Sequence, residues 1–208
     1  MPNRFALRGL ALAALAAASL AAPSQASAAL VQTAPCDGAA LTQPFSRWGD
    51  GRWYKLVPGA DAERSVSGWT YAGGAKRVSG SETFAATGKL GAWSFSVPAG
   101  GSVTTAATCV NAAYPSFRFF VKSSGGLLGV LPALKVDAVY RDGLLGLVSV
   151  PVGTVLPSSS WKPSPSMLTL SAVGAAVAGG QVPLSLRFTS LAGTWQVDDV
   201  FVDPLRRS

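Results

Sequence analysis

Short runs of alternating apolar and polar residues decide which fold classes this chain can adopt. Successive side chains of a strand point to opposite faces, so apolar residues at every second position indicate strands with one buried face. After residue 28, no segment keeps an apolar period of 3.6 residues, which disfavours amphipathic helices. The clearest runs lie at 93–97, 117–121, 134–140 and 184–188, and weaker ones at 53–57, 69–72, 75–78, 103–110, 145–152 and 167–173.

Glycine, proline and serine clusters separate these runs. Pro98-Ala99-Gly100-Gly101 and Arg141-Asp142-Gly143 have the composition of hairpin turns, and residues 157–165 predict a longer loop. Strands at this spacing indicate a sandwich or a barrel. We therefore predict an all-β chain that forms one antiparallel β-sandwich.

The N-terminus has the three parts of a secretory signal. Arg4 and Arg8 precede an apolar stretch at 9–22, and Ala26-Ser27-Ala28 fits a cleavage site. A membrane anchor is the alternative, but a span needs about 20 apolar residues. We expect a signal peptide at 1–28, an N-terminal arm with few strand signals at 29–52, and a sandwich domain at 53–208. The expected location is outside the cell, with no membrane span after cleavage.

Two cysteines, Cys36 and Cys109, would enter an oxidising compartment if the chain is exported. An even cysteine count in such a compartment favours a disulfide between them, with two free thiols or a metal pair as alternatives. The chain has no histidine, which removes the usual base of a catalytic cysteine and excludes a Ser-His-Asp triad.

The charge balance is basic. The net charge of +7 falls to +5 when Arg4 and Arg8 leave with the signal. A basic surface suits acidic glycans or other acidic envelope polymers, but ordinary solubility charge is the preferred explanation, because the sign of the charge alone says little about function. There is no run of Lys and Arg, and we expect no nucleic-acid partner.

Adjacent carboxylates stand out in the last predicted strand, at 195–204. The apolar residues Trp195 and Val197 occupy odd-numbered positions, whereas Val200 and Val202 occupy even-numbered ones, so the apolar face changes parity along the strand. This change of parity across Asp198 and Asp199 predicts a β-bulge. A bulge can turn both side chains toward one side, which favours a structural or metal-binding role. A catalytic role is disfavoured, because nothing else in the sequence supplies a partner for these two acids.

Two short sequence motifs, an opening phrase and a closing phrase, give the chain a family resemblance over residues 53–205. Leu56-Val57-Pro58-Gly59-Ala60-Asp61-Ala62-Glu63, followed by Ser67-Gly68-Trp69-Thr70, resembles the opening of galactose-binding-like jelly rolls. These are carbohydrate-binding modules found beside glycoside hydrolases. Val197-Asp198-Asp199-Val200 resembles their closing strand. Ala60 and Ala62 depart from the family pattern. The chain after the signal is also similar to stand-alone secreted proteins of high-GC Gram-positive bacteria.

The resemblance implies a β-jelly roll and a structural calcium. In those modules an acid of the opening strand and an Asp of the closing strand often share the ion, and the matching residues here are Glu63 and Asp199. Asp61 and Asp198 are further candidates. Calcium prefers six to eight oxygen ligands. The alternative is that these carboxylates are solvated or pair with arginines.

Tryptophans are the first candidates for ligand contact. Trp93 and Trp195 lie on the apolar parity and are expected in the core. Trp48 lies in the glycine-containing arm and Trp161 in the Ser/Pro-rich loop, so these two are expected to be exposed.

Charged residues on the parity opposite the core are the second candidates. Those strands could form one basic stripe, or a solvated sheet surface with ion pairs. The residues are Arg118, Lys122, Lys135, Asp137, Arg141 and Arg187.

The sequence therefore predicts a secreted, non-catalytic β-sandwich that binds a glycan or another cell-envelope polymer. The predicted ligand contacts are Trp48, Trp161, Arg118, Lys135, Asp137 and Arg187. One alternative is a structural or protein-interaction module of the envelope without a glycan site. Another is a small secreted polysaccharide hydrolase or lyase.

Overall fold

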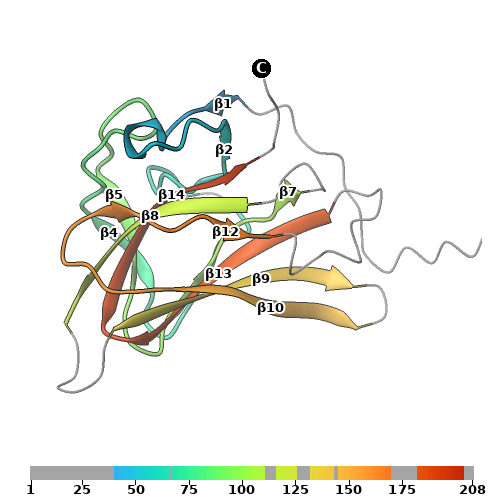
Figure 1. Cartoon of the computed structure of the whole chain (residues 1–208). Coiled ribbons are helices and arrows are strands. Elements are labelled where there is room, and N and C mark those ends of the chain that lie inside the picture. Colours follow the sequence, from blue (N-terminus) through green and yellow to red (C-terminus); the bar gives the residue numbers. More distant parts are fainter. Residues whose placement is uncertain are drawn as a thin grey trace, which may run out of the picture.

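Two antiparallel sheets form the described part of the chain, as its computed structural model shows (Figure 1). The structure describes residues 40–65, 67–110, 116–125, 132–142, 145–169 and 182–203. Within these ranges the only helix is a short 3₁₀ turn, η1 (Ser46–Trp48). The predicted all-β sandwich of jelly-roll type is confirmed.

The larger sheet is organised around its closing strand. Strand β14 pairs with β5 and β2 along one edge and with β8 along the other. The strands of this sheet are β1 (Leu41–Thr42), β2 (Tyr54–Leu56), β4 (Lys76–Ser79), β5 (Trp93–Val97), β8 (Ser116–Ser124), β11 (Lys162–Pro163), β12 (Met167–Leu168) and β14 (Thr194–Asp203).

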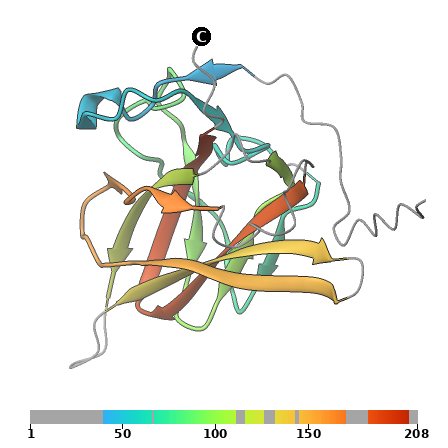
Figure 2. The ribbon, with the colours of Figure 1, turned by 45° about the vertical axis from the view of Figure 1, so that its right-hand side comes forward.

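The smaller sheet has the order β10-β9-β13-β6-β3, and β7 pairs with β13 as well. Its strands are β3 (Thr70–Ala72), β6 (Ser102–Thr104), β7 (Thr108–Val110), β9 (Ala133–Asp142), β10 (Gly146–Val155) and β13 (Val182–Ala192). Figure 2 shows β9, β10 and β13 crossing below the strands of the larger sheet. The antiparallel pairing expected on either side of residues 141–143 is confirmed, because Asp142 of β9 lies opposite Gly146 of β10, whereas Gly143 itself lies outside the described residues.

The core fills the space between the sheets, and the alternation seen in the sequence puts it there. Along β13, residues from Val182 to Ser190 alternate between buried and half-buried. Phe119 of the larger sheet meets Phe188 of the smaller one edge to face, with ring centres 4.8 Å apart. Trp195 is completely buried, as predicted. Each large apolar side chain buried in this way stabilises the fold by about 1.5–3 kcal/mol.

Three local predictions were wrong. The run at 103–110 forms two strands, β6 and β7, rather than one. Pro98–Gly101 does form a turn, with the Gly101 N–H donating to the Pro98 carbonyl, but it leads from β5 in the larger sheet to β6 in the smaller one and joins no hairpin. Trp93 has core parity but lies at the beginning of β5, where 37% of it stays exposed beneath the Arg77 guanidinium.

The segment at 40–52, the described part of the predicted arm, packs on the outer face of the larger sheet. Phe45 is completely buried there against Tyr54, Phe120 and Phe201, with ring centres 4.9–5.6 Å apart. The outer face of this sheet therefore carries a second, smaller apolar cluster. This cluster positions the candidate site.

Candidate functional site

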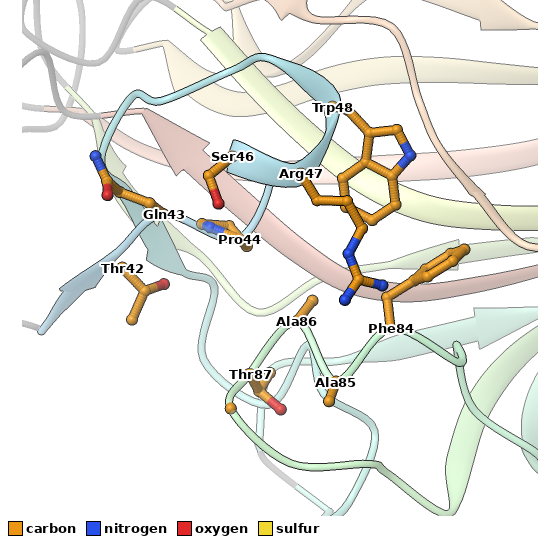
Figure 3. Close-up of a pocket in the computed structure, with 11 residues that line it drawn as sticks. Thr42, Gln43, Pro44, Ser46, Arg47, Trp48, Phe84, Ala85, Ala86 and Thr87 are labelled. Atoms are coloured by element: carbon orange, nitrogen blue, oxygen red, sulfur yellow. The ribbon is translucent and has the colours of Figure 1, made fainter.

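A groove of about 310 Å³ lies between the 40–52 segment and the loop that follows β4 (Figure 3). One wall consists of Thr42, Gln43, Pro44, Ser46, Arg47 and Trp48, and the other of residues 84–88. None of the described lining residues is Asp or Glu. The groove thus combines aromatic, hydroxyl and amide groups with a single cation.

Arg47 forms the centre of the groove's chemistry. Its guanidinium carbon lies 5.8 Å from the ring centres of both Trp48 and Phe84, and Figure 3 shows the side chain reaching over the two rings. The rings themselves meet edge to face, with centres 4.8 Å apart. Within the described part of the chain, Arg47 forms no ion pair, so its donors remain available to a ligand.

Contacts with Phe120 and Glu82 hold both walls of the groove in place. Trp48 and Phe84 pack against Phe120 of β8, with ring centres 5.4 and 5.6 Å away. The buried carboxylate of Glu82 accepts hydrogen bonds from the backbone N–H groups of Phe84 and Ala86. These contacts hold the aromatic side chains in place before any ligand arrives, which reduces the entropy lost on binding.

A second, smaller hollow of about 200 Å³ lies further along β8. It is lined by Lys122, Ser123, Ser124, Ser159, Thr194 and Gln196. The Lys122 ammonium lies 4.9 Å from the ring centre of Trp161, which also packs against the outer apolar cluster. The structure therefore brings Trp48 and Trp161 to the same face of the larger sheet, and both are half-buried rather than fully exposed.

The six charged residues do not form one stripe, which corrects that expectation. Arg118 and Lys122 belong to β8 of the larger sheet, whereas Lys135, Asp137, Arg141 and Arg187 belong to β9 and β13 of the smaller one. Alternation reveals which face of its own sheet a residue occupies. It does not reveal which of the two sheets a strand joins.

The Arg118 side chain forms its hydrogen bonds and its ion pair within the protein. Its guanidinium donates to Asp50 Oδ2 at 2.8 Å and to the Ser164 carbonyl at 3.0 Å, and it lies over the Phe45 ring at 4.5 Å. Asp50 also accepts from Arg52 and from the Tyr54 hydroxyl. Burial alone would raise the pKa of Asp50, but hydrogen bonds from these three donors outweigh it and hold that pKa well below its usual range. This network attaches the 40–52 segment to the sandwich.

On the smaller sheet, Lys135, Asp137 and Arg187 lie together. Lys135 forms an ion pair with Asp137 at 3.1 Å, and Asp137 is the register partner of Arg187. The Arg187 side chain donates to Thr104 Oγ1 at 3.3 Å. The buried Asp137 offers little surface to a ligand. A role for these residues in ligand contact stays a prediction.

The predicted bulge at Asp198 and Asp199 is confirmed. The register between β14 and β8 shifts after Asp198, and Asp199 adopts a positive φ of 46°. The Asp199 N–H donates to the Ala60 carbonyl at 2.8 Å, which connects the opening phrase to the closing strand. Both carboxyl groups are buried. Burial, reinforced by the charges of neighbouring acids, raises the pKa of each.

The acids beside Asp199 differ from those that the calcium prediction expects. Asp198 and Glu82 lie beside Asp199, whereas Glu63 accepts hydrogen bonds from the N–H groups of Ala92 and Trp93. Among the described residues, no group of three or more acidic, cysteine or histidine side chains is arranged to hold a metal ion. Calcium binding by Glu63 and Asp199 stays a prediction.

Some predicted features lie outside the described residues. Cys109, in β7, is not a free cysteine, but Cys36 is outside the described ranges, so the pairing of Cys36 with Cys109 stays a prediction. The signal peptide lies outside them as well, and secretion is untested. No helix within the described ranges is long and apolar enough to cross a membrane.

Sequence reasoning identified Trp48 and Trp161 but missed most of the groove. Arg47 and Phe84 carry no motif, and about 37 positions separate these two contacting residues in the sequence. The pair Arg47-Trp48 in a polar segment was the one available signal. It combines a cation with an aromatic ring on a short turn.

Comparisons with known proteins return structures only. No family model and no curated protein matches the chain. It is similar to the CBM22-1 xylan-binding domain from Paenibacillus barcinonensis, with 16% identity, 72% of this chain and 94% of that one covered, and a TM-score of 0.47. It is also similar to a C-terminal CBM6 of a laminarinase from Zobellia galactanivorans, with 9% identity, 65% and 98% covered, and a TM-score of 0.40. Both of these proteins are carbohydrate-binding modules.

Proposed function

We propose that this protein is a non-catalytic module that binds a glycan, or a glycan-like polymer of the cell envelope, in the groove beside Trp48. The observation that carries the proposal is the groove itself, where Trp48, Phe84 and Arg47 border a volume of about 310 Å³. That volume is at the lower end of ligand pockets.

The chemistry of the walls suits a sugar. Aromatic rings offer apolar faces to the C–H faces of a sugar ring, and Arg47 supplies several directed N–H donors for hydroxyl oxygens. Ser46, Thr42 and Gln43 add donors and acceptors around the rim. Because no Asp or Glu is among the described lining residues, the groove lacks the pair of carboxylates that glycosidic bond cleavage needs. This favours binding over hydrolysis.

A glycan array with the purified protein tests the proposal, followed by calorimetry on each bound glycan. Trp48→Ala should weaken binding at least tenfold, because it removes one aromatic wall. Arg47→Ala, a substitution at an exposed position, should weaken it several-fold without loss of fold. The matched control is Trp93→Ala, which removes a part-exposed tryptophan that does not line the groove.

Two outcomes would contradict the proposal. One is no binding to any glycan on the array, which would favour the protein-interaction module. The other is equal loss of affinity in Trp48→Ala and Trp93→Ala. Melting temperatures of all variants show whether a loss of affinity reflects unfolding.

A further inference from the structure

Beyond the groove, the outer face of the larger sheet carries a second polar region, in which one buried side-chain atom has no partner among the described residues. The Gln196 Oε1 atom is buried and accepts no hydrogen bond from the described residues. A buried polar atom without a partner destabilises a fold, so its persistence requires an explanation. Gln196 lines the hollow beside Lys122.

The register of three strand pairs places Gln196 in a row of polar side chains. Lys76 of β4 is opposite Ser96 of β5, Ser96 is opposite Gln196 of β14, and Gln196 is opposite Lys122 of β8. Register partners in an antiparallel sheet share a face. The row thus spans about 14 Å across four strands and has a lysine at each end.

No carboxylate belongs to this row or to the described lining of the hollow. Lys122 forms no ion pair within the described ranges, and its ammonium is held over the Trp161 ring at 4.9 Å. A fixed cation next to hydroxyl and amide groups is suited to a carboxylate on a polar ligand. A neutral sugar would leave this cation unused.

The hollow and the groove have separate lining residues, but both lie beside β8. Phe120, which supports Trp48 and Phe84, precedes Lys122 by two residues on the same face, a distance of about 7 Å along a strand. Trp161 packs against the same apolar cluster as Trp48. Figure 2 shows η1 and the loop that leads into β11 on the same side of the molecule.

We propose that the hollow lined by Lys122 and Gln196, next to Trp161, is a second subsite, which holds a carboxylate-bearing sugar residue of the same polymer that occupies the groove. This inference rests on the proposed glycan binding and makes it more specific: the ligand is an acidic polysaccharide. The Lys122 ammonium pairs with the carboxylate, and the Gln196 amide hydrogen-bonds a hydroxyl group.

Calorimetry with matched probes tests the subsite. The probes are polygalacturonate and alginate as uronic-acid polymers, fully methyl-esterified polygalacturonate as the neutral form of one backbone, and polyglutamate as an acidic polymer without sugars. The wild-type protein should bind at least one uronic-acid polymer more tightly than the ester. Lys122→Gln should lower that affinity about tenfold and leave affinity for the ester unchanged. Lys122→Arg should restore most of it.

Arg141→Gln is the matched control, since it removes one positive charge from the exposed part of the other sheet. If Lys122→Gln and Arg141→Gln reduce binding equally, or if polyglutamate binds as tightly as the uronic-acid polymers, general charge attraction explains the effect and the subsite is refuted. Binding to neutral glycans alone, lost in Trp48→Ala and unchanged in Lys122→Gln, would refute the subsite but retain the groove. Absence of binding to every polymer here and every glycan on the array would refute both.

Discussion

Asp198 and Asp199 place two neighbouring carboxyl groups inside the protein, where the Asp199 N–H donates to Asp198 Oδ1 at 3.0 Å. Asp198 Oδ2 accepts from the Ser81 hydroxyl and from the Glu82 N–H. Glu82 is buried as well. Three acids in one interior cluster repel one another when they are ionised, so the fold favours the protonated form of some of them.

The cluster predicts that the protein loses stability as the pH rises. Burial first, and then neighbouring charges, raises the pKa of Asp198 to about 7 and that of Asp199 to about 9. Both values exceed those of the unfolded chain, so the folded state binds more protons above about pH 4 and the free energy of unfolding falls through about pH 9. Thermal melts in chelator should show the melting temperature falling by at least about 8 °C between pH 5 and pH 9, since each kcal/mol lost lowers it by about 2–4 °C in a chain of this size. Asp199→Asn should flatten this dependence, and an unchanged slope in that variant would contradict the explanation.

Calcium binding would offset part of the stability that the protein loses at high pH. If Asp199 is a ligand, as the family resemblance implies, saturating calcium should raise the melting temperature at pH 8. An ion at 100 times its dissociation constant stabilises the folded state by about 2.7 kcal/mol. Melts in calcium, in magnesium and in EDTA measure this directly. The Asp199→Asn variant should lose the calcium response, and identical melts of the wild-type protein in calcium and EDTA would exclude the ion.

The Asp50 network predicts a second pH dependence, of the opposite sign. The pKa of Asp50 lies below that of the unfolded chain, so its contribution is complete above about pH 4 and is lost as the pH falls. Asp50→Ala leaves the half-buried Arg118 without its carboxylate and should destabilise the protein by about 3 kcal/mol at pH 7. Denaturant titrations at pH 7 and pH 3 measure the difference between variant and wild type. A difference of the same size at both pH values would show that the charge is not responsible.

Phe45 should couple the stability of the 40–52 segment to ligand binding. Phe45→Ala removes a completely buried ring and is expected to cost about 3–4 kcal/mol. Because Phe45 precedes η1 directly, the variant should also lose glycan affinity at temperatures where the sandwich stays folded. Limited proteolysis should then cut within 40–52 before any other described segment. Phe188→Ala is the control, since it lies in the core between the sheets and should reduce stability without selective cleavage there.

The predicted bond between Cys36 and Cys109 has a simple thermal test. A bond between these cysteines would close a loop of about 74 residues, which stabilises a protein by about 4 kcal/mol in the chain-entropy description. Cys109→Ser should therefore lower the melting temperature by roughly 10 °C in oxidising buffer and hardly at all in strong reductant. Cys36→Ser should behave identically. Equal losses in both buffers would show that the two cysteines are not bonded to each other.

The β content and the core could be predicted because alternation is a local property. The runs containing Phe95, Phe119 and Phe188 each reveal their buried face without knowledge of any other strand. The bulge at Asp198 was predictable for the same reason, since a change of parity is visible within one strand. Trp93 shows where prediction from alternation fails: it has core parity but stays partly exposed, because parity does not indicate where a sheet ends.

The candidate site could be predicted only in part, because its two walls come from separate connections. Trp48 was a candidate by residue type, but its partnership with Phe84 depends on how the two segments pack over Phe120. The separation of Arg118 from Arg187 has a similar origin. Both residues have outward parity, yet their strands join different sheets, and that choice depends on the global topology.

The groove is built almost entirely from connections, while Phe120 of β8 supports it from the larger sheet. Substitutions at Ser46, Arg47 or Thr87 would therefore change the ligand without altering any residue of the core between the sheets. A library randomised at these positions, with Phe45 and Glu82 kept, offers a route to binders of chosen specificity. In such an engineered protein, the sandwich would act as a rigid support for an exchangeable surface.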